Sequence, residues 1–98
     1  MKLRILELAA LEIEDGQEYY NLQQAKLGDS FKRDIQIAID NIVASPELYP
    51  TIDGGLRRCV LHRFPYNIYY AIDDDMIVIL SVAHQRRKPY YWIYDGRV

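Results

Sequence analysis

A run of eight residues near the end of the chain constrains the fold more than any other feature of the sequence. Residues Met76-Ile77-Val78-Ile79-Leu80-Ser81-Val82-Ala83 are apolar at both odd and even positions. Alternate residues of a strand point to opposite faces of a sheet, so a strand of this kind must be covered on both faces, or nearly so. The run therefore predicts a central strand with other elements packed on its two sides.

Two further runs with the composition of strands precede it. Leu56–His62 and Ile68–Ile72 contain the β-branched and aromatic residues that strands prefer. Arg63-Phe64-Pro65-Tyr66-Asn67 separates them, because proline cannot donate a hydrogen bond to a ladder, and Asp73-Asp74-Asp75 forms a polar turn. We therefore predict a three-stranded antiparallel meander in the second half of the chain.

The first half predicts a short strand and two helices. Lys2–Leu6 is short and apolar enough for a first strand. Two series of residues then recur at steps of three and four, as amphipathic helices require. The first is Ala10, Ile13, Gln17 and Tyr20, and the second, entirely apolar, is Leu27, Phe31, Ile35, Ala38 and Ile42. The second helix should stop near Ser45, because Pro46 disfavours helical geometry in the residue before it. The expected architecture is α+β: a short N-terminal strand, a helical hairpin packed against a sheet, and the three-stranded meander.

Length and composition exclude several classes of protein. The 98 residues are half apolar and predict one folded domain, residues 1–98. The single cysteine, Cys59, cannot form an internal disulfide, and no cysteine and histidine spacing suggests a metal site, so we expect neither metal nor cofactor. No run approaches membrane-spanning length. A cytoplasmic protein without membrane attachment is the expectation.

Charge is distributed unequally along the chain. Residues 1–54 hold five basic side chains against ten acidic ones, a net charge of −5, whereas residues 55–98 hold seven against four, a net charge of +3. An anionic partner should therefore meet the second half of the chain.

The same half carries a family resemblance. In order, the chain reads Tyr49-Pro50, Gly54-Gly55-Leu56-Arg57-Arg58, Arg63-Phe64-Pro65-Tyr66-Asn67-Ile68-Tyr69-Tyr70, and Val82-Ala83-His84-Gln85-Arg86-Arg87-Lys88-Pro89-Tyr90-Tyr91-Trp92. This pattern resembles the RelE/ParE superfamily of toxins from bacterial type II toxin–antitoxin systems, and its tail favours the ParE-like, plasmid-stabilisation branch. The resemblance implies a twisted antiparallel sheet with the helical hairpin on one face. It implies, too, a cognate antitoxin, encoded by the adjacent gene, whose C-terminal segment wraps the toxin in a hetero-oligomer. It also implies contact with operator DNA only through that antitoxin.

The resemblance leaves three functions open. ParE-like members inhibit DNA gyrase by protein contact, RelE-like members cleave messenger RNA on the ribosome without a metal, and a non-toxic member would only bind its antitoxin and regulate their operon. Cleavage needs cations to neutralise the phosphorane and a group to move protons, for which Arg58, Arg87 and Tyr91 are the candidates. The slightly acidic chain favours the gyrase hypothesis, since ribosome-directed members are usually strongly basic.

The candidate target-binding residues gather after the strands and in the tail. Arginine and aromatic residues are enriched in the energetically dominant contacts of protein interfaces. We expect these side chains to be free to contact a target; they are Arg63, His84, Arg86, Arg87, Lys88, Tyr91 and Trp92. For His84 a structural role, with the ring bonded to a neighbouring carbonyl or carboxylate at the end of its strand, is favoured over a catalytic one.

Overall fold

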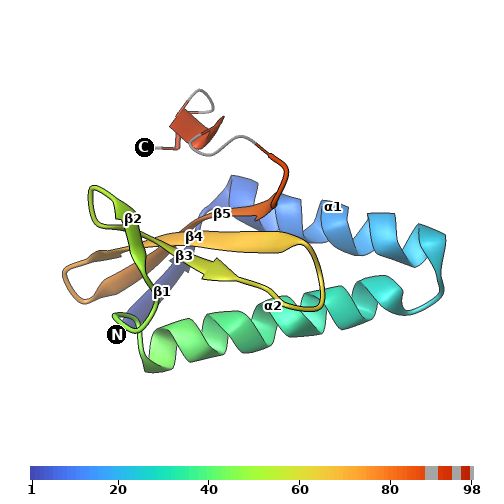
Figure 1. The fold of residues 1–98 in the computed structure, drawn as a ribbon, viewed down its shortest axis with the longest axis horizontal. Coiled ribbons are helices and arrows are strands. Elements are labelled where there is room, and N and C mark those ends of the chain that lie inside the picture. Colours follow the sequence, from blue (N-terminus) through green and yellow to red (C-terminus); the bar gives the residue numbers. More distant parts are fainter. Residues whose placement is uncertain (88–90, 94–95, 98) are drawn as a thin grey trace.

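The computed structural model describes residues 1–87, 91–93 and 96–97 (Figure 1). A five-stranded sheet has the order β1-β5-β4-β3-β2, and two helices connect its first strand to the rest. In chain order the elements are β1 (Lys2–Ile5), α1 (Glu7–Gln23), α2 (Leu27–Ala44), β2 (Thr51–Asp53), β3 (Leu56–Val60), β4 (Tyr66–Asp73), β5 (Met76–His84) and the 3-10 turn η1 (Tyr91–Ile93).

The predicted α+β architecture is confirmed, with two corrections to the sheet. The meander has four strands rather than three, because β2 pairs with β3 around Gly54 and Gly55, which both have positive φ. A strand of three residues is too short to produce a recognisable alternation. In addition, the resemblance implied an antiparallel sheet, but the sheet is mixed, since β1 pairs with β5 in parallel.

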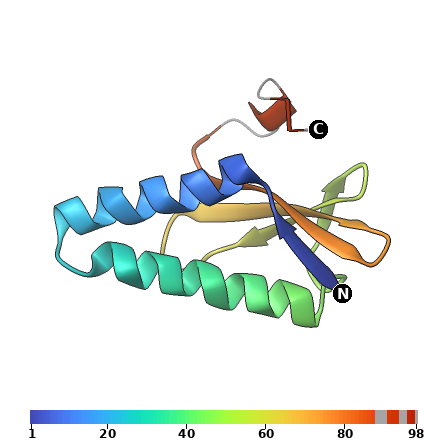
Figure 2. The same ribbon diagram turned by 180° about the vertical axis from the view of Figure 1, so that it is seen from behind.

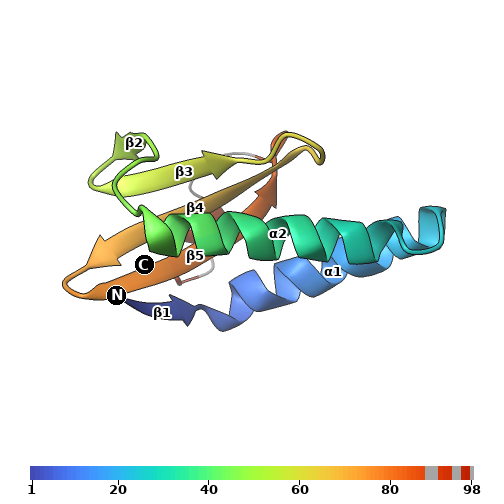
Figure 3. The ribbon, with the colours of Figure 1, turned by 90° about the horizontal axis from the view of Figure 1, so that it is seen from below.

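Both helices pack on the same face of the sheet (Figure 3). The second helix buries the predicted residues Phe31, Ile35, Ala38 and Ile42 and ends at Ala44, as the following Ser45-Pro46 predicts. In the first helix Ile13 and Tyr20 are buried as predicted. The other two buried residues are Ala9 and Gly16, next to the predicted Ala10 and Gln17.

Gly16 occupies a buried position because an aromatic ring lies against the helix backbone there. A Cβ atom at Gly16 would lie 2.6 Å from Cε2 of Phe31, closer than carbon atoms approach without a shift. Phe31 is itself fixed by the rings of Tyr20, Phe64 and Tyr66, with centroid distances of 4.8 to 5.4 Å. Glycine is less favourable than alanine in a helix by about 1 kcal/mol, but only glycine leaves room for this ring contact.

A β-bulge at Leu80 divides β5 into two parts. Tyr69 pairs with Ser81 and Tyr70 pairs with Ile79, so Leu80 has no partner in β4. Before the bulge, Ile77 and Ile79 belong to the core under the helices; after it, Val82 belongs to that core, while Ala83 packs on the opposite face. The extra residue thus reverses the alternation of the strand.

The opposite face, which we call the outer face, is covered by the C-terminal segment (Figures 1 and 2). Trp92 is only 1% exposed and its ring lies 4.7 Å from that of Tyr69. Ile52 and Leu56 pack against the same cluster. The prediction that residues 76–83 are covered on both sides is therefore confirmed.

Within the described ranges, no helix is long and apolar enough to cross a membrane.

Candidate functional site: the outer face and the C-terminal turn

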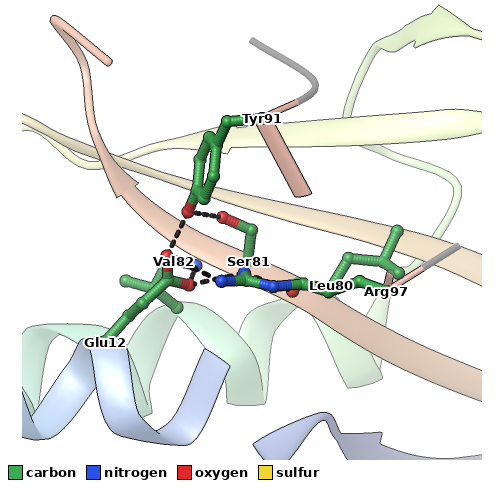
Figure 4. A network of polar contacts seen from close by, with 6 residues as sticks. All are labelled: Glu12, Leu80, Ser81, Val82, Tyr91 and Arg97. Atoms are coloured by element: carbon green, nitrogen blue, oxygen red, sulfur yellow. Dashed lines mark hydrogen bonds and ion pairs between the residues drawn. The ribbon is translucent and has the colours of Figure 1, made fainter. Parts of the chain in front are cut away.

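Four polar side chains from distant parts of the sequence meet beside β5 (Figure 4). The Glu12 carboxylate accepts hydrogen bonds from the backbone N–H of Val82 at 3.1 Å and from the Tyr91 hydroxyl. It also forms an ion pair with Arg97, with 2.9 Å between Nη1 and Oε1. The hydroxyl oxygens of Ser81 and Tyr91 are 2.5 Å apart. These contacts fix the C-terminal segment to both α1 and the sheet.

The network satisfies backbone groups that the sheet leaves open. β1 pairs with β5 only from Met76 to Ile79, and the chain then turns into α1. Beyond that point the Val82 N–H donates to Glu12, and the Leu80 carbonyl accepts from Arg97 at 3.1 Å. Buried backbone groups are costly without a partner, so two side chains take over where the neighbouring strand ends.

Burial determines the protonation of the network. It raises the pKa of Tyr91, and the hydrogen bond to the Glu12 carboxylate raises it further. Burial alone would lower the pKa of Arg97, but the hydrogen bonds and charge of Glu12 outweigh this and raise it. Tyr91 is therefore a neutral phenol at neutral pH, and its proton is directed at a carboxylate.

The turn after β5 carries two exposed arginines. Its backbone is closed by a hydrogen bond of 2.9 Å from the Arg87 N–H to the His84 carbonyl. The His84 Nδ1 atom accepts the Arg86 N–H at 3.1 Å. The Arg87 guanidinium lies 3.6 Å from the centre of the Tyr91 ring, which is a cation–π contact.

Arg58 lies elsewhere on the outer face. It is paired across the sheet with Tyr69, which is paired in turn with Ser81, so the three form one row. The Arg58 Nε atom is buried without a hydrogen-bond partner among the described residues. Among the residues that the structure describes, no hydrogen bond or cation–π contact joins Arg58 to Arg87 or Tyr91. The structure therefore brings together two of the three candidate catalytic residues, Arg87 and Tyr91, and not the third.

Arg63 lies in the loop between β3 and β4. This loop contacts the turn after β5, since the Gln85 N–H donates to the Pro65 carbonyl at 2.7 Å. The Arg63 side chain is 65% exposed and its Nε atom lies 3.5 Å from Asp34 of α2. Arg63 and the turn arginines thus share one end of the sheet, but Arg63 is directed toward the helices.

The expectation that the tail side chains are free is wrong for Tyr91 and Trp92. Trp92 is buried on the outer face, and the Tyr91 hydroxyl is engaged by Ser81 and Glu12, because the second apolar face of β5 requires a cover. Lys88 lies outside the described residues. His84 is bonded to a neighbouring backbone group, in the structural role favoured from the sequence, although the partner is an N–H rather than a carbonyl or carboxylate.

Sequence reasoning missed Glu12, Ser81 and Arg97. Glu12 is separated from Arg97 by 85 residues, and neither belongs to a motif, so no local signal joins them. Within the described residues, no group of histidine, cysteine, aspartate or glutamate side chains is arranged to hold a metal ion.

Comparison with known proteins decides the family. The profile of the ParE toxin of the type II toxin–antitoxin system parDE matches residues 3–89. The chain belongs to the ParE toxin family. It is therefore similar throughout most of its length to the toxin component of a type II toxin–antitoxin pair, as the sequence pattern predicted, and an antitoxin is the partner that membership implies.

Solved structures support the same fold for this ParE family member. A chain of the chromosomal ParDE toxin–antitoxin system from P. aeruginosa superposes with a TM-score of 0.65 at 17% identity, covering 86% of this chain and 95% of that one. The isolated E. coli RelE toxin gives a TM-score of 0.65 at 18% identity, covering 98% and 96%. No curated protein matches the sequence significantly.

Proposed function

We propose that this ParE family member arrests growth by binding DNA gyrase through the turn after β5, and that it does not cleave RNA. The observation that carries the proposal is the position of Tyr91. Its hydroxyl donates to the Glu12 carboxylate and is held beside Ser81, while burial keeps the pKa of the phenol raised. A general acid or base works best with a pKa near the operating pH and with a proton that can reach the substrate. The raised pKa of Tyr91 and the engagement of its hydroxyl by Glu12 and Ser81 both disfavour this role.

The other requirement of RNA cleavage is a group of cations around the reacting phosphate. Arg87 is stacked on the Tyr91 ring, whereas no hydrogen bond or cation–π contact joins Arg58 to either residue in the described part of the chain. The net charge of the chain is −2, which gives little general attraction for a polyanion such as the ribosome. Both features favour a protein target over RNA.

The proposed contact surface consists of Arg86 and Arg87, with the Tyr91 ring beneath. Both arginines are exposed, and the turn that carries them is fixed by hydrogen bonds to His84. A preordered arginine pair beside an aromatic ring is the composition typical of the residues that dominate protein interfaces. Arg63, at the same end of the sheet, would extend this surface.

The test is a purified gyrase supercoiling assay with an Arg86→Ala, Arg87→Ala double variant. We expect the wild-type protein to inhibit supercoiling and the double variant to lose inhibition by at least tenfold, while its unfolding free energy changes by no more than about 0.5 kcal/mol for each exposed arginine. A double variant as potent as the wild-type protein would show that the contact surface lies elsewhere.

Substitutions at Tyr91 separate binding from cleavage. Tyr91→Phe keeps the ring under Arg87 and removes only the hydroxyl, so inhibition should persist, with a loss of stability of about 1–2 kcal/mol from the missing hydrogen bonds. Tyr91→Ala should abolish inhibition. Ribosome-dependent cleavage of messenger RNA by the wild-type protein, abolished in Tyr91→Phe, would refute the gyrase proposal in favour of a metal-independent endoribonuclease.

Neutralisation by an antitoxin completes the proposal. Co-expression of the antitoxin from the adjacent gene should restore growth, and saturating antitoxin should raise the thermal midpoint, as any ligand of the native state does. The complex would be a hetero-oligomer that meets operator DNA through the antitoxin. Normal growth at confirmed expression of the toxin alone would leave only the non-toxic, regulatory function.

A further inference from the structure

Each backbone N–H group of the turn after β5 donates a hydrogen bond, and one of these bonds depends on the protonation of a side chain. The Gln85 N–H donates to the Pro65 carbonyl at 2.7 Å, and the Arg87 N–H donates to the His84 carbonyl at 2.9 Å. The Arg86 N–H donates instead to Nδ1 of the His84 ring at 3.1 Å. A carbonyl oxygen is always an acceptor, whereas a ring nitrogen of histidine accepts only while it carries no proton.

The geometry defines the state of the ring. Nδ1 accepts, so the neutral imidazole of His84 carries its proton on Nε2. In the imidazolium both nitrogens are donors, and the Nδ1 proton would point at the Arg86 N–H. The pairing of β4 with β5 ends at Tyr66 and His84, so Arg86 lies beyond the ladder and its N–H relies on the ring. Protonation therefore removes this hydrogen bond.

A proton on His84 would also add to the positive charge of the turn. Arg86 and Arg87 follow His84 directly in the sequence, so an imidazolium would be the third cation in four residues. The other charged or titratable side chains of this region come from the neighbouring elements: Tyr66 of β4, Arg63 of the β3–β4 loop with its partner Asp34, Tyr91 of η1, and Glu12, Asp15 and Tyr19 of α1, which share a pocket with Tyr66 and Arg87. The Glu12 carboxylate is neutralised by Arg97. Repulsion among the three cations favours opening of the turn.

We propose that His84 is a positioning residue that makes the arginine surface sensitive to pH: the neutral ring holds the turn of Arg86 and Arg87 in place, and the protonated ring releases it. The inference rests on the proposed function for its effect on the target, because it takes these arginines as the contact. Ordering a loop on contact weakens binding, so a turn that is ordered beforehand binds more tightly. Since histidine changes charge between about pH 5 and pH 8, affinity should fall with acidification in that range.

Two substitutions separate the acceptor from the ring. His84→Asn supplies an oxygen near the position of Nδ1, and asparagine commonly accepts the N–H group two residues on; this oxygen does not titrate. His84→Phe keeps a ring against Tyr66, whose centroid lies 5.4 Å from that of His84, but has no acceptor. His62→Asn is the matched control, because His62 is the other histidine of the chain and is exposed after β3.

The Arg86 amide proton reports the hydrogen bond without reference to any target. In the nuclear magnetic resonance spectrum of the wild-type protein, its chemical shift and temperature coefficient should follow the titration of the His84 ring from about pH 8 to about pH 6. His84→Asn should keep the values of the wild-type protein at pH 8 throughout this range, and His84→Phe should show the low-pH values throughout. His62→Asn should behave as the wild-type protein does. If His84→Phe does not fold, the wild-type protein and His84→Asn still decide the result.

Binding to purified gyrase, measured by titration calorimetry, tests the consequence. From about pH 8 to about pH 6 the wild-type protein and His62→Asn should each lose at least threefold in affinity relative to His84→Asn, a ratio in which the titration of gyrase itself cancels. His84→Phe should bind at least threefold more weakly than His84→Asn at both pH values. An Arg86 amide that does not follow the His84 titration, or equal affinities of the folded asparagine and phenylalanine variants, would overturn this inference alone. A wild-type protein that does not bind gyrase at pH 8 would overturn the proposed function, and the amide measurement would still decide whether His84 controls the turn.

Discussion

Replacing Glu12 with alanine removes the acceptor that joins α1, β5 and the C-terminal segment. In the native state its carboxylate is 14% exposed and the Arg97 side chain 5% exposed, so the variant would leave a buried guanidinium without its counter-ion. Removing one partner of a buried ion pair costs about 3–5 kcal/mol. The chain has one alternative, which is to release the C-terminal segment and hydrate Arg97. Release exposes Trp92 and Tyr91, and losing the burial of a tryptophan costs about 3–5 kcal/mol as well.

The smaller of the two costs determines the outcome, so we expect Glu12→Ala to lower the unfolding free energy by about 3 kcal/mol. For a domain of this size that corresponds to a fall in thermal midpoint of about 12–24 °C. Urea unfolding followed by circular dichroism measures the loss. Trp92 is the only tryptophan, so its emission reports separately whether the segment stays on the outer face. A red-shifted emission with native far-ultraviolet circular dichroism would identify release as the cheaper route.

Glu14→Ala is the control, because Glu14 is exposed on the same helix and should move stability by no more than about 0.5 kcal/mol. If Glu12→Ala matched this control in stability and kept the wild-type emission, the Glu12 network would contribute nothing to the fold. The argument that Tyr91 is withheld from catalysis would then fail too.

Two further predictions concern the core under the helices. Gly16→Ala should destabilise the protein by about 1–3 kcal/mol in urea, because the new Cβ would lie 2.6 Å from Phe31, and overpacking outweighs the gain of about 1 kcal/mol in helix propensity; a more stable variant would show that the ring can move. Burial raises the pKa of Tyr70 from 10.0 to about 12, so its contribution to stability is complete below pH 10 and is lost as the pH rises toward 12. Chemical denaturation from pH 9 to 12 should show this decline, and Tyr70→Phe should reduce it; an equal decline in both proteins would assign it to other tyrosines.

The elements that could be predicted from sequence are those whose side chains repeat at a regular period. Helix α2 and the strands β3, β4 and β5 have such repeats, and their buried residues follow them. In helix α1 the burial of Ile13 and Tyr20 was predicted, but that of Ala9 and Gly16 was missed because these residues carry little or no apolar side chain. Small residues mark close packing, and hydrophobic periodicity does not detect them.

The candidate site was less accessible to sequence reasoning. The arginines after β5 could be located, because a turn had to follow an apolar strand. The burial of Trp92 was missed, although the apolar character of β5 on both faces required some segment to cover the second face. Nothing local to the sequence identifies which segment does so. The partners that hold the cover in place, Glu12 and Arg97, are brought together only by the tertiary fold.

The parallel pairing of β1 with β5 has a consequence for synthesis of the toxin. A chain made from its N-terminus can form the α1–α2 hairpin early, but β1 has no partner until Met76–Ile79 has emerged. Glu12 gains its ion pair later still, since Arg97 lies 85 residues after it in the sequence. Contacts of such high sequence separation form slowly and late. The sheet and the Glu12 network are therefore completed only after residues 76–97 have been synthesised, and a shorter nascent chain lacks both.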